Sequence, residues 1–326
     1  MDLVSLDIGG THARFAIASV DANGMISLGE TTTLKTSDFA SLGTAWEEFE
    51  RRHGAPIPRS AAIAIAGPVT GDTVQMTNNS WVIHTGSLDR QLGLDHVTVL
   101  NDFAAVAHAA ATAGPHEFSH LAGPDVPFPS AGTISVIGPG TGLGVAQYHR
   151  FDGQYVVQPT EGGHIDFAPV DSVDDAILQR LRKRHRRVSA ERIVSGPGII
   201  EIYTALAVLE GRAVPECGDT AIWEAGLNGT DSLAAAAVEH FCLSLGSLAG
   251  DLALAHGAGG VVIAGGLGYR IRDTLMRSGF AERFAFKGRY EQRMASLPVK
   301  LITHPQPGLF GAAAAFARDH AREHAS

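Results

Sequence analysis

The apolar residues of this chain fall into two patterns, short continuous runs and longer stretches with a helical repeat. Short runs are typical of buried strands, and apolar residues at i, i+3 and i+4 are typical of helices that bury one face. The runs predict strands at Leu3–Ile8, Phe15–Val20, Thr31–Thr36, Ser60–Ala66, Val97–Leu100, Val261–Ala264 and Val299–Thr303. The helical stretches are Phe39–His53, Phe103–Ala113, Val173–His185, Ile199–Leu209, Asp231–His256 and Gly308–Glu323. Hairpins mixed with crossover helices indicate an α/β protein.

Two turns rich in glycine and threonine stand between predicted strands. Leu3–Val20 and Thr133–His149 each predict a strand, a tight turn and a second strand. Glycine leaves the N–H groups of a turn accessible because it has no Cβ, and successive N–H groups form a concave site for phosphate oxygens. Either turn alone also fits a plain hairpin. Together with a third apolar–glycine segment, Gly260–Leu267, they favour two related halves that hold one polyphosphate.

The glycine turns differ from the commoner nucleotide motifs. A P-loop requires a lysine after its last glycine, and neither turn has one. A dinucleotide fold requires a helix after its glycine-rich loop, whereas both turns lead into predicted strands. Asn101-Asp102-Phe103-Ala104 is not a protein-kinase D-F-G segment, and no H-R-D sequence accompanies it. A phosphate site in this chain is therefore of another kind.

Length, charge and cysteine content restrict the class of protein. The 326 residues are enough for two domains, and the proline-containing connector Gly114–Ala131 predicts the first boundary. A net charge of −9 argues against a nucleic-acid partner, and we interpret the basic run Arg180–Arg187 as a solvated helix face. We find neither a signal peptide nor an apolar run of the about 18 residues that span a bilayer, so no membrane partner is expected. Cys217 and Cys242 form no CxxC pair, which favours a reduced, cytoplasmic protein.

Polar side chains rich in acceptors follow several of the predicted strands and turns. They are Asn78, Asn101, Asp102, Glu161, His164, Asp166 and Glu191. Carboxylates and amides that each bond a hydroxyl recognise a neutral polyol. Asp102 opens a predicted helix and suits two roles equally, a base that takes a proton from a hydroxyl or a cap of that helix. No His, Cys or Asp grouping has metal-ligand spacing, so no structural metal is expected.

The order of motifs along nearly the whole chain resembles one enzyme family. Asp7–Arg14 is similar to the phosphate-1 turn of the actin/hexokinase/Hsp70 superfamily, Gly138–Gly144 to its phosphate-2 turn and Val262–Gly266 to its adenosine segment. The intervening motifs are Met76–Trp81, Leu100–Phe103, Glu161–Pro169 and Val188–Gly198. In this order the motifs resemble the bacterial ATP-dependent glucokinases of the proteobacterial type.

The resemblance implies two α/β domains of the actin/hexokinase type, each with a ribonuclease-H-like core, that flank a cleft. Residues 1–113 plus 305–326 would form a small domain with the phosphate-1 turn and the catalytic aspartate. Residues 114–304 would form a large domain with the phosphate-2 turn and the sugar-binding and adenosine segments. At the level of the family, a homodimer is expected.

The resemblance also implies a role for each site residue. Asp102 would be the base that activates the 6-hydroxyl of glucose, to give glucose 6-phosphate, and would hold sugar hydroxyls together with Asn101, Glu161, His164 and Glu191. The phosphates of ATP would lie on Gly9, Gly10, Thr11, Gly140 and Thr141, and the adenosine against Gly265 and Gly266. Asp7 would position Mg²⁺ through water. The implied partners are the small molecules glucose and MgATP.

Two alternatives share these motifs. A kinase for another hexose or for an N-acetylated amino sugar would use the same phosphate turns. A sugar-sensing regulator without turnover would carry an additional DNA-binding segment, which an acidic chain with Asp7 in its first turn does not suggest. Asn79 stands where many relatives have histidine. The related ROK group carries a cysteine-rich zinc motif that is missing here, so no structural zinc is expected.

Overall fold

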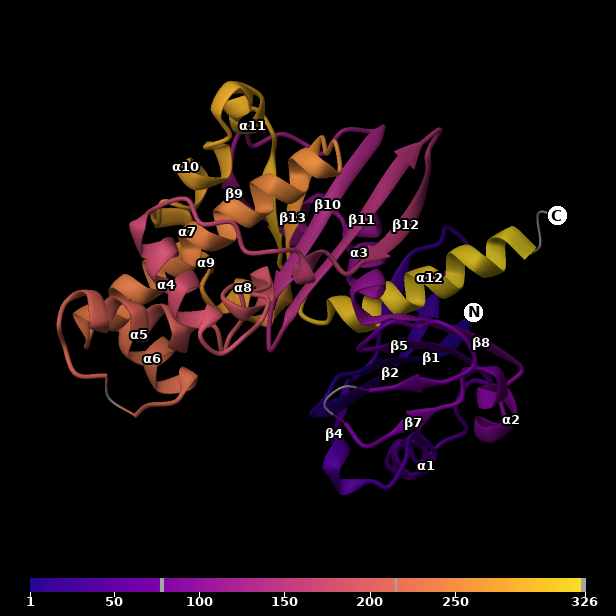
Figure 1. Ribbon diagram of the computed structural model, residues 1–326. Helices are drawn as coiled ribbons and strands as arrows, with labels where there is room; N and C mark the ends of the chain where they lie inside the picture. The colour runs from indigo at the N-terminus through magenta and orange to yellow at the C-terminus, as the bar shows by residue number, and fades with distance from the viewer. Residues whose placement is uncertain (77–78, 215, 324–326) are drawn as a thin grey trace. The chain divides into compact units, whose positions relative to one another are not determined.

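The chain folds into two compact units, each built around its own sheet (Figure 1). The computed structural model describes residues 1–76, 79–214 and 216–323. Unit 1 comprises Met1–Gly114 and His304–Ser326, and unit 2 comprises Pro115–Thr303. Strands and helices are mixed in both units, which confirms the expectation of an α/β protein.

In its described residues, unit 1 contains a main sheet, a small two-stranded sheet and four α-helices. The strands are β1 (Asp2–Ile8), β2 (His12–Val20), β3 (Ile26–Leu28), β4 (Thr32–Lys35), β5 (Ser60–Ile65), β6 (Val74–Gln75), β7 (Val82–Ile83) and β8 (His96–Asn101). The helices are α1 (Leu42–His53), α2 (Leu88–Leu92), α3 (Asp102–Thr112) and α12 (Pro307–Glu323). The main sheet has the order β3-β2-β1-β5-β8; β1 and β2 form an antiparallel hairpin, and β1, β5 and β8 are parallel.

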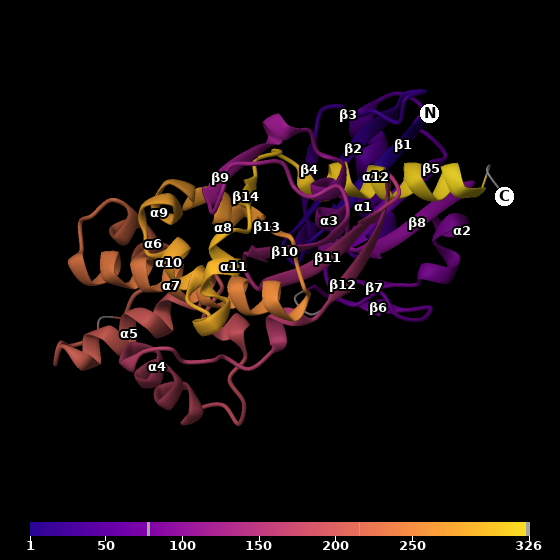
Figure 2. The same ribbon diagram turned by 90° about the horizontal axis from the view of Figure 1, so that it is seen from above.

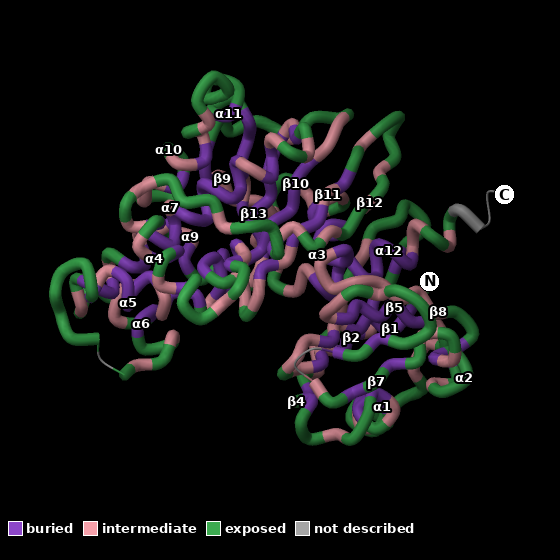
Figure 3. Tube along the Cα trace, in the orientation of Figure 1, coloured by how far each residue is buried: buried purple, intermediate pink, exposed green. Residues whose placement is uncertain are grey.

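Different helices cover the two faces of this sheet, because successive side chains of a strand point to opposite faces. Val4 and Leu6 lie in one core cluster with Trp46 of α1. Leu3 lies in a second cluster with Phe316 of α12. The odd-numbered positions of β1 therefore face α12, and the burial of the central strands between the two layers is visible in Figure 3.

Helices α3 and α12 lie side by side (Figures 1 and 2). Gly311 permits this approach, since a Cβ there would lie 1.7 Å from Ala105 O. The Ser5 hydroxyl on β1 donates a hydrogen bond to Leu309 O at 2.6 Å. The C-terminal helix is thus part of unit 1, although the whole of unit 2 precedes it in the sequence.

Unit 2 repeats the sheet pattern of unit 1 with more helices. Its strands are β9 (Phe118–Ala122), β10 (Gly132–Pro139), β11 (Leu143–Phe151), β12 (Gln154–Thr160), β13 (Gly260–Ile263) and β14 (Val299–Ile302). Its helices are α4 (Ser172–Arg182), α5 (Ile199–Leu209), α6 (Asp219–Leu227), α7 (Ser232–Ala255), α8 (Gly265–Arg270), α9 (Arg272–Arg277), α10 (Phe280–Ala285) and α11 (Glu291–Ala295). The sheet order is β12-β11-β10-β13-β14-β9. In both units an antiparallel hairpin is followed by two further parallel strands.

Helix α7 belongs to the core of unit 2. Its length and apolar composition would allow it to span a membrane, which corrects the expectation that no segment has this property. However, 78% of its most apolar window is buried, and Phe241 and Leu245 lie in the main hydrophobic cluster. The burial explains the composition without a membrane.

Several boundaries differ from those expected. The helix expected over Phe39–His53 begins at Leu42, because the Ser41 hydroxyl accepts from Thr44 N–H while Thr44 Oγ1 accepts from Ser41 N–H. The connector expected over Gly114–Ala131 contains β9, which pairs with β14. The apolar pattern does not predict β3, β12, α6 or the short helices α8 to α11.

Candidate functional site

The carboxyl edge of the unit 1 sheet brings predicted site segments together. Ile8, Ile65 and Asn101 lie in one row across the parallel strands β1, β5 and β8. The Gly9–Thr11 turn follows β1, and Asp102 follows β8. Neighbouring strands lie about 4.8 Å apart, so about 10 Å separates the ends of β1 and β8. Ligands of open α/β sheets bind at this edge, which makes it the candidate site of unit 1.

The turn after β1 has two carbonyl groups bound and two N–H groups available. Gly9 N–H donates to His12 O at 2.9 Å. Thr36 donates through its N–H to Thr11 O at 3.0 Å and through its hydroxyl to Gly10 O at 2.9 Å. The N–H groups of Gly10 and Thr11 have no acceptor among the described residues. These two donors are available to an anion, as the sequence predicts.

Asp7 lies beside the start of α12. A Cβ on Gly308 would lie 2.7 Å from Asp7 Oδ2, so glycine at that position lets the helix approach the carboxylate. Arg14 Nη1 is 3.5 Å from the same oxygen, which is long for a hydrogen bond. Burial raises the pKa of Asp7, and the charge and hydrogen bond of Arg14 offset this only in part. The carboxylate is therefore incompletely compensated by the protein.

The N-cap residue of α3 is Asn101. Asp102, for which the sequence leaves the roles of cap and base open, follows it as the first residue of the helix. Asn101 Oδ1 accepts from the N–H groups of Phe103 and Ala104 at 2.9 and 3.0 Å, and its Nδ2 donates to Gly67 O at 2.9 Å. Asp102 is the half-buried first residue of α3, and its Oδ1 accepts from Phe103 N–H at 2.8 Å. Because Asn101 caps α3, Asp102 is not required as the N-cap residue of this helix.

The turn of the second hairpin is held by two other segments of unit 2. Gly140 N–H donates to Gly142 O at 2.8 Å, which closes the turn. Gly140 O accepts from Gly196 N–H at 2.7 Å, and Leu143 N–H donates to Glu191 Oε2 at 2.9 Å. The second predicted phosphate turn therefore carries a carboxylate at its far end.

Nothing in the described residues of the folded units requires glycine at position 9 of the first turn or at position 140 of the second. Neither Gly9 nor Gly140 has a positive φ. A Cβ at these positions would lie 3.5 and 4.0 Å from the nearest described atom, which is ordinary contact. A side chain would therefore fit the folded unit. Since glycine also permits a ligand to approach the backbone, this supports both turns as binding surfaces.

Glu161 and His164 reach the second hairpin because the two glycines between them pack on β11. A Cβ on Gly163 would lie 2.2 Å from Leu143 O, and Gly162 is also crowded by β11. Glu161 Oε2 and His164 Nε2 are 3.9 Å apart, and both side chains are more than half exposed. The Glu-Gly-Gly-His sequence thus places a carboxylate and an imidazole beside the second turn.

A pocket of about 320 Å³ joins several of the predicted residues of unit 2. Thr141, His164 and Glu191 line it, together with Arg192 and His185, whose Nη1 and Nε2 atoms are 3.3 Å apart. Its volume lies near the lower limit of small-molecule sites, about 300 Å³. Sequence reasoning does not single out Arg192 or His185 as site residues, although Arg192 directly follows Glu191.

Besides Asn101 and Asp102 of unit 1, three further predicted polar residues are not among those that line this pocket. Glu161 is not among the pocket residues. Asp166 is 74% exposed and pairs with Arg187 at 2.5 Å. Asn78 lies outside the described residues.

Gly265 and Gly266 open α8 beside the second hairpin. Gly265 has a φ of +82°, and a Cβ there would lie 2.7 Å from Pro139 O, so both the conformation and the close approach require glycine. Ala264 N–H donates to Ile137 O at 2.8 Å, which ties the segment to β10. No described atom lies within 4 Å of a Cβ built on Gly266. The start of α8 offers a surface without side chains next to the second turn.

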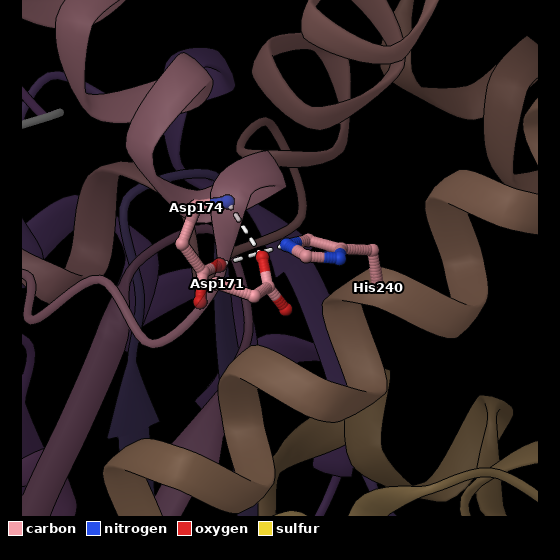
Figure 4. A group of neighbouring side chains, drawn as sticks. All are labelled: Asp171, Asp174 and His240. Carbon is pink, nitrogen blue, oxygen red and sulfur yellow. Dashed lines mark hydrogen bonds and ion pairs between the residues drawn. The ribbon is translucent and has the colours of Figure 1, made fainter.

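The structure also gathers three potential metal ligands that the sequence spacing does not reveal (Figure 4). One ligand atom each of Asp171, Asp174 and His240 lies within 4.8 Å of the others. His240 Nε2 is 2.7 Å from Asp174 Oδ1, and Arg283 donates to both aspartates. Asp171 also caps α4 by accepting from Val173 N–H at 2.9 Å. Because a guanidinium and an imidazole already bind the carboxylates, we interpret this group as a structural ion-pair network.

The chain matches known proteins over almost its entire length. A protein-family model described as Glucokinase matches residues 4–319. A curated glucokinase of Zymomonas mobilis subsp. mobilis is 55% identical, over 98% of this chain and 99% of its own. A curated glucokinase of Caulobacter vibrioides is 43% identical, over 95% of this chain and 93% of its own.

Solved structures share the fold. A glucokinase from an Antarctic psychrotroph superposes with a TM-score of 0.85 at 35% identity, over 97% of this chain and 99% of that chain. A ROK family glucokinase from Streptomyces griseus, in complex with glucose and AMPPNP, has a TM-score of 0.61 at 19% identity, over 98% of this chain and 100% of that chain. At that identity the second likeness shows the fold alone, which is of the actin/hexokinase type.

Proposed function

Because the chain belongs to the glucokinase family, we propose that it transfers the γ-phosphoryl group of ATP to the 6-hydroxyl of glucose, with Asp102 as the general base. ATP-dependent phosphorylation of glucose follows from membership of the family. The roles of individual residues are the proposal, and they rest on the geometry of each unit.

The position of Asp102 is the observation that carries the proposed mechanism. Its carboxylate stands at the first residue of α3, on the sheet edge that also carries the Gly9–Thr11 turn, while Asn101 supplies the cap. As the 6-hydroxyl oxygen attacks the γ-phosphorus, Asp102 accepts the hydroxyl proton and ADP departs. General-base assistance of this kind contributes about 10²–10⁴-fold to the rate.

The sugar hydroxyls would be held by Asn101, Glu161, His164 and Glu191, with Asp102 at the reacting hydroxyl. The side-chain amide of Asn101 accepts through Oδ1 from two backbone N–H groups and donates one N–H of Nδ2 to Gly67 O. The second N–H of Nδ2 can therefore donate to a sugar hydroxyl. His164 and Glu191 line the same pocket. A site that bonds each hydroxyl rejects sugars that lack one, because a polar partner would be left unpaired.

The phosphates of ATP would lie on the two hairpin turns. In the first turn the N–H groups of Gly10 and Thr11 are the available donors, with Gly9 leaving room for the ligand. In the second turn Gly140 leaves similar room and Thr141 lines the pocket. The adenosine would lie against Gly265 and Gly266 at the start of α8.

The surroundings of Asp7 fit a magnesium ion bound through water. The carboxylate is largely buried and only partly compensated by Arg14. Mg²⁺ prefers oxygen ligands and usually keeps several of its waters. When bound, the ion would neutralise charge on the transferred phosphoryl group. Asp7 would accept hydrogen bonds from water ligands of the ion and so orient it.

Two broader properties belong to the same proposal. We expect a homodimer, which sedimentation velocity over a range of protein concentrations would detect. We expect the protein in the cytoplasm, where its small-molecule substrates glucose and MgATP are found. A single species of monomer mass at all concentrations would contradict the expected homodimer. Recovery of the protein in the membrane fraction would contradict the expected cytoplasmic location.

A coupled assay tests the reaction. The wild-type protein, MgATP and glucose are combined, and glucose 6-phosphate is measured with its dehydrogenase. Mannose and N-acetylmannosamine are then added as competitors. We expect glucose to be the preferred substrate. Turnover that requires a different sugar, or ATP hydrolysis without a phosphorylated sugar, would contradict the proposal.

A further inference from the structure

Glu191 contacts the second turn as well as the pocket. Its Oε2 accepts a hydrogen bond from Leu143 N–H at 2.9 Å. The same carboxylate lies against Gly142, where a Cβ would be 2.6 Å from Oε2 and 3.4 Å from Cδ. Its Oε1 has no partner among the described residues. One oxygen therefore binds the turn while the other remains for a ligand in the pocket.

The backbone around Glu191 is held firmly, so this contact is not a chance surface approach. Ala190 N–H donates to Ile165 O at 2.9 Å, and Phe167 N–H donates to Val188 O at 3.0 Å. Ala190 is buried, and it precedes Glu191 in a single 3₁₀ turn. The side chain of Glu191 is thus aimed at the turn by a rigid segment.

The glycine at position 142 has a different explanation from those at 9 and 140. Gly142 does not have a positive φ, so its backbone conformation is open to other residues. The carboxylate of Glu191 is the only group among the described residues that a Cβ on Gly142 would meet within 4 Å. Glycine at this position therefore admits the Glu191 carboxylate to the turn.

We propose that Glu191 is a positioning residue for the second phosphate turn, in addition to its role at the sugar. Its Oε2 fixes the turn through Leu143 N–H, and its Oε1 accepts a sugar hydroxyl. Preorganising a binding loop strengthens ligand binding because less conformational freedom is lost. The inference rests on the proposed function, since it assigns the turn to the nucleotide and the pocket to the sugar.

Gly142→Ala tests the position of the Glu191 carboxylate without removing its charge. The added Cβ displaces the carboxylate from the turn but leaves its charge in the protein. If the contact positions the turn, this variant binds nucleotide less tightly in the absence of sugar, by about tenfold, the usual scale for one hydrogen bond to a charged group. Loss of charge repulsion cannot produce this result, because no charge is removed.

The test is a double-mutant cycle on nucleotide affinity, measured by calorimetry with the magnesium complex of AMPPNP and no sugar. Gly142→Ala is made in the wild-type background and in the Glu191→Ala background. We expect Gly142→Ala to weaken nucleotide binding about tenfold in the wild-type background and less than about twofold in the Glu191→Ala background, because substitutions of contacting residues are not additive. Gly43→Ala is the control, because its Cβ would only reach Ser41 Oγ at 3.6 Å.

An equal effect of Gly142→Ala in both backgrounds, or no effect in either, would overturn the inference. Glu191→Asp is a second variant in case Gly142→Ala does not fold. Its shorter side chain keeps the charge but falls short of Leu143 N–H, so the same weakening is expected, and unchanged affinity would count against the inference. The coupled glucose assay on the wild-type preparation separates the two claims. Wild-type turnover together with additive effects in the cycle rejects the positioning role alone, and absence of wild-type turnover rejects the proposed function.

Discussion

Asp7 of unit 1 and Asp174 of unit 2 both lose most of their contact with water. The protein replaces the lost hydration of their carboxylates with hydrogen bonds and opposite charges to very different degrees. Burial raises the pKa of Asp7, and Arg14 at 3.5 Å does not reverse the change. Burial also raises the pKa of Asp174, but hydrogen bonds from His240 and from a backbone N–H, with the charges of His240 and Arg283, outweigh it. The net pKa of Asp174 therefore lies below its usual value.

The difference shows how to distinguish a carboxylate that binds a ligand from one that belongs to a structural ion-pair network. A buried charge that lacks partners reduces stability, and such groups concentrate where a ligand supplies the missing interaction. Asp171, Asp174 and His240 have the spacing of a metal site, yet Arg283 binds both aspartates. Within the part of the chain that the structure describes, Asp7 has one distant partner, Arg14, and it is the better candidate for a cation. Incomplete compensation, rather than the number of acidic groups, marks the site.

The two hairpins differ in a related way. Ile8 O accepts from Ala66 N–H, and Ile137 O accepts from Ala264 N–H, so the two isoleucines occupy equivalent positions. The first turn follows Ile8 directly, whereas the second hairpin continues through the pairs Gly138–Gly144 and Pro139–Leu143. The second turn thus projects farther from its sheet, which explains why it needs the added contacts of Glu191 and Gly196.

The largest expected effect is on catalysis in unit 1. Asp102→Ala removes the proposed base but leaves the Asn101 cap, so kcat should fall by about 10²–10⁴-fold while the unfolding midpoint changes little. Steady-state kinetics with glucose and MgATP, together with circular dichroism, measure both quantities. Near-normal turnover would remove Asp102 from the catalytic role.

The next effect is on the stability of unit 2. Asp174→Asn breaks a buried ion-pair network and should cost about 3 kcal/mol of unfolding free energy near neutral pH. Because the folded pKa of Asp174 lies below the unfolded value of about 3.9, its stabilisation is present above that pH and is lost as pH falls through the folded pKa. Denaturant unfolding of both proteins over a pH series would show the two curves converging in acid. A difference that stays constant with pH would contradict this interpretation of the network.

A smaller loss of stability is expected in unit 1 when the cap is removed. Asn101→Ala leaves Ala104 N–H without its acceptor and leaves Phe103 N–H with Asp102 Oδ1 alone, and it should cost about 1–2 kcal/mol. Asn101→Asp keeps an acceptor and serves as the matched control, with most of the stability retained. Thermal unfolding compares the three proteins, and equal midpoints would show that Asn101 is not the effective cap.

The smallest effect has the opposite sign. Asp7→Asn removes a carboxylate whose ionised form is disfavoured by burial, so the free energy of unfolding at neutral pH should rise, by up to about 1 kcal/mol. The same variant should bind Mg²⁺-nucleotide less tightly. Thermal unfolding and calorimetry report the two changes. A variant that is less stable than wild type would show that Asp7 is adequately compensated and would weaken the contrast with Asp174.

Regular patterns in the sequence predicted much of the fold. The apolar runs at Leu3–Ile8 and Ser60–Ala66 and the helical stretch Asp231–His256 correspond to β1, β5 and α7, because each buries a long, continuous set of apolar residues. The helices α8 to α11 escaped prediction since each is too short to establish a helical repeat. Strand β12 escaped it because its residues alternate between exposed and half-buried positions without a marked apolar side.

The candidate site was predicted in part. The glycine turns and the acids near them follow from composition and order along the chain. Whether Asp102 is the cap of α3 did not follow, because Asn101 can also cap a helix and only the backbone geometry decides which oxygen meets the N–H groups. Arg192 and His185 were also missed, as nothing in their spacing marks them as neighbours in a pocket.

The sequence by itself determined the two glycine-rich hairpins, the α/β class and the ordered motifs of the glucokinase family, since these depend on residue type and local spacing. Only the tertiary structure decided which acids are compensated and which are not. Asp174 meets a histidine and an arginine that are distant in sequence, and Glu191 meets Leu143. Among the described residues, Asp7 is left with a single long ion pair, to Arg14. The energy of a charge depends on the groups that folding brings around it, and those neighbours are not encoded at any one position of the chain.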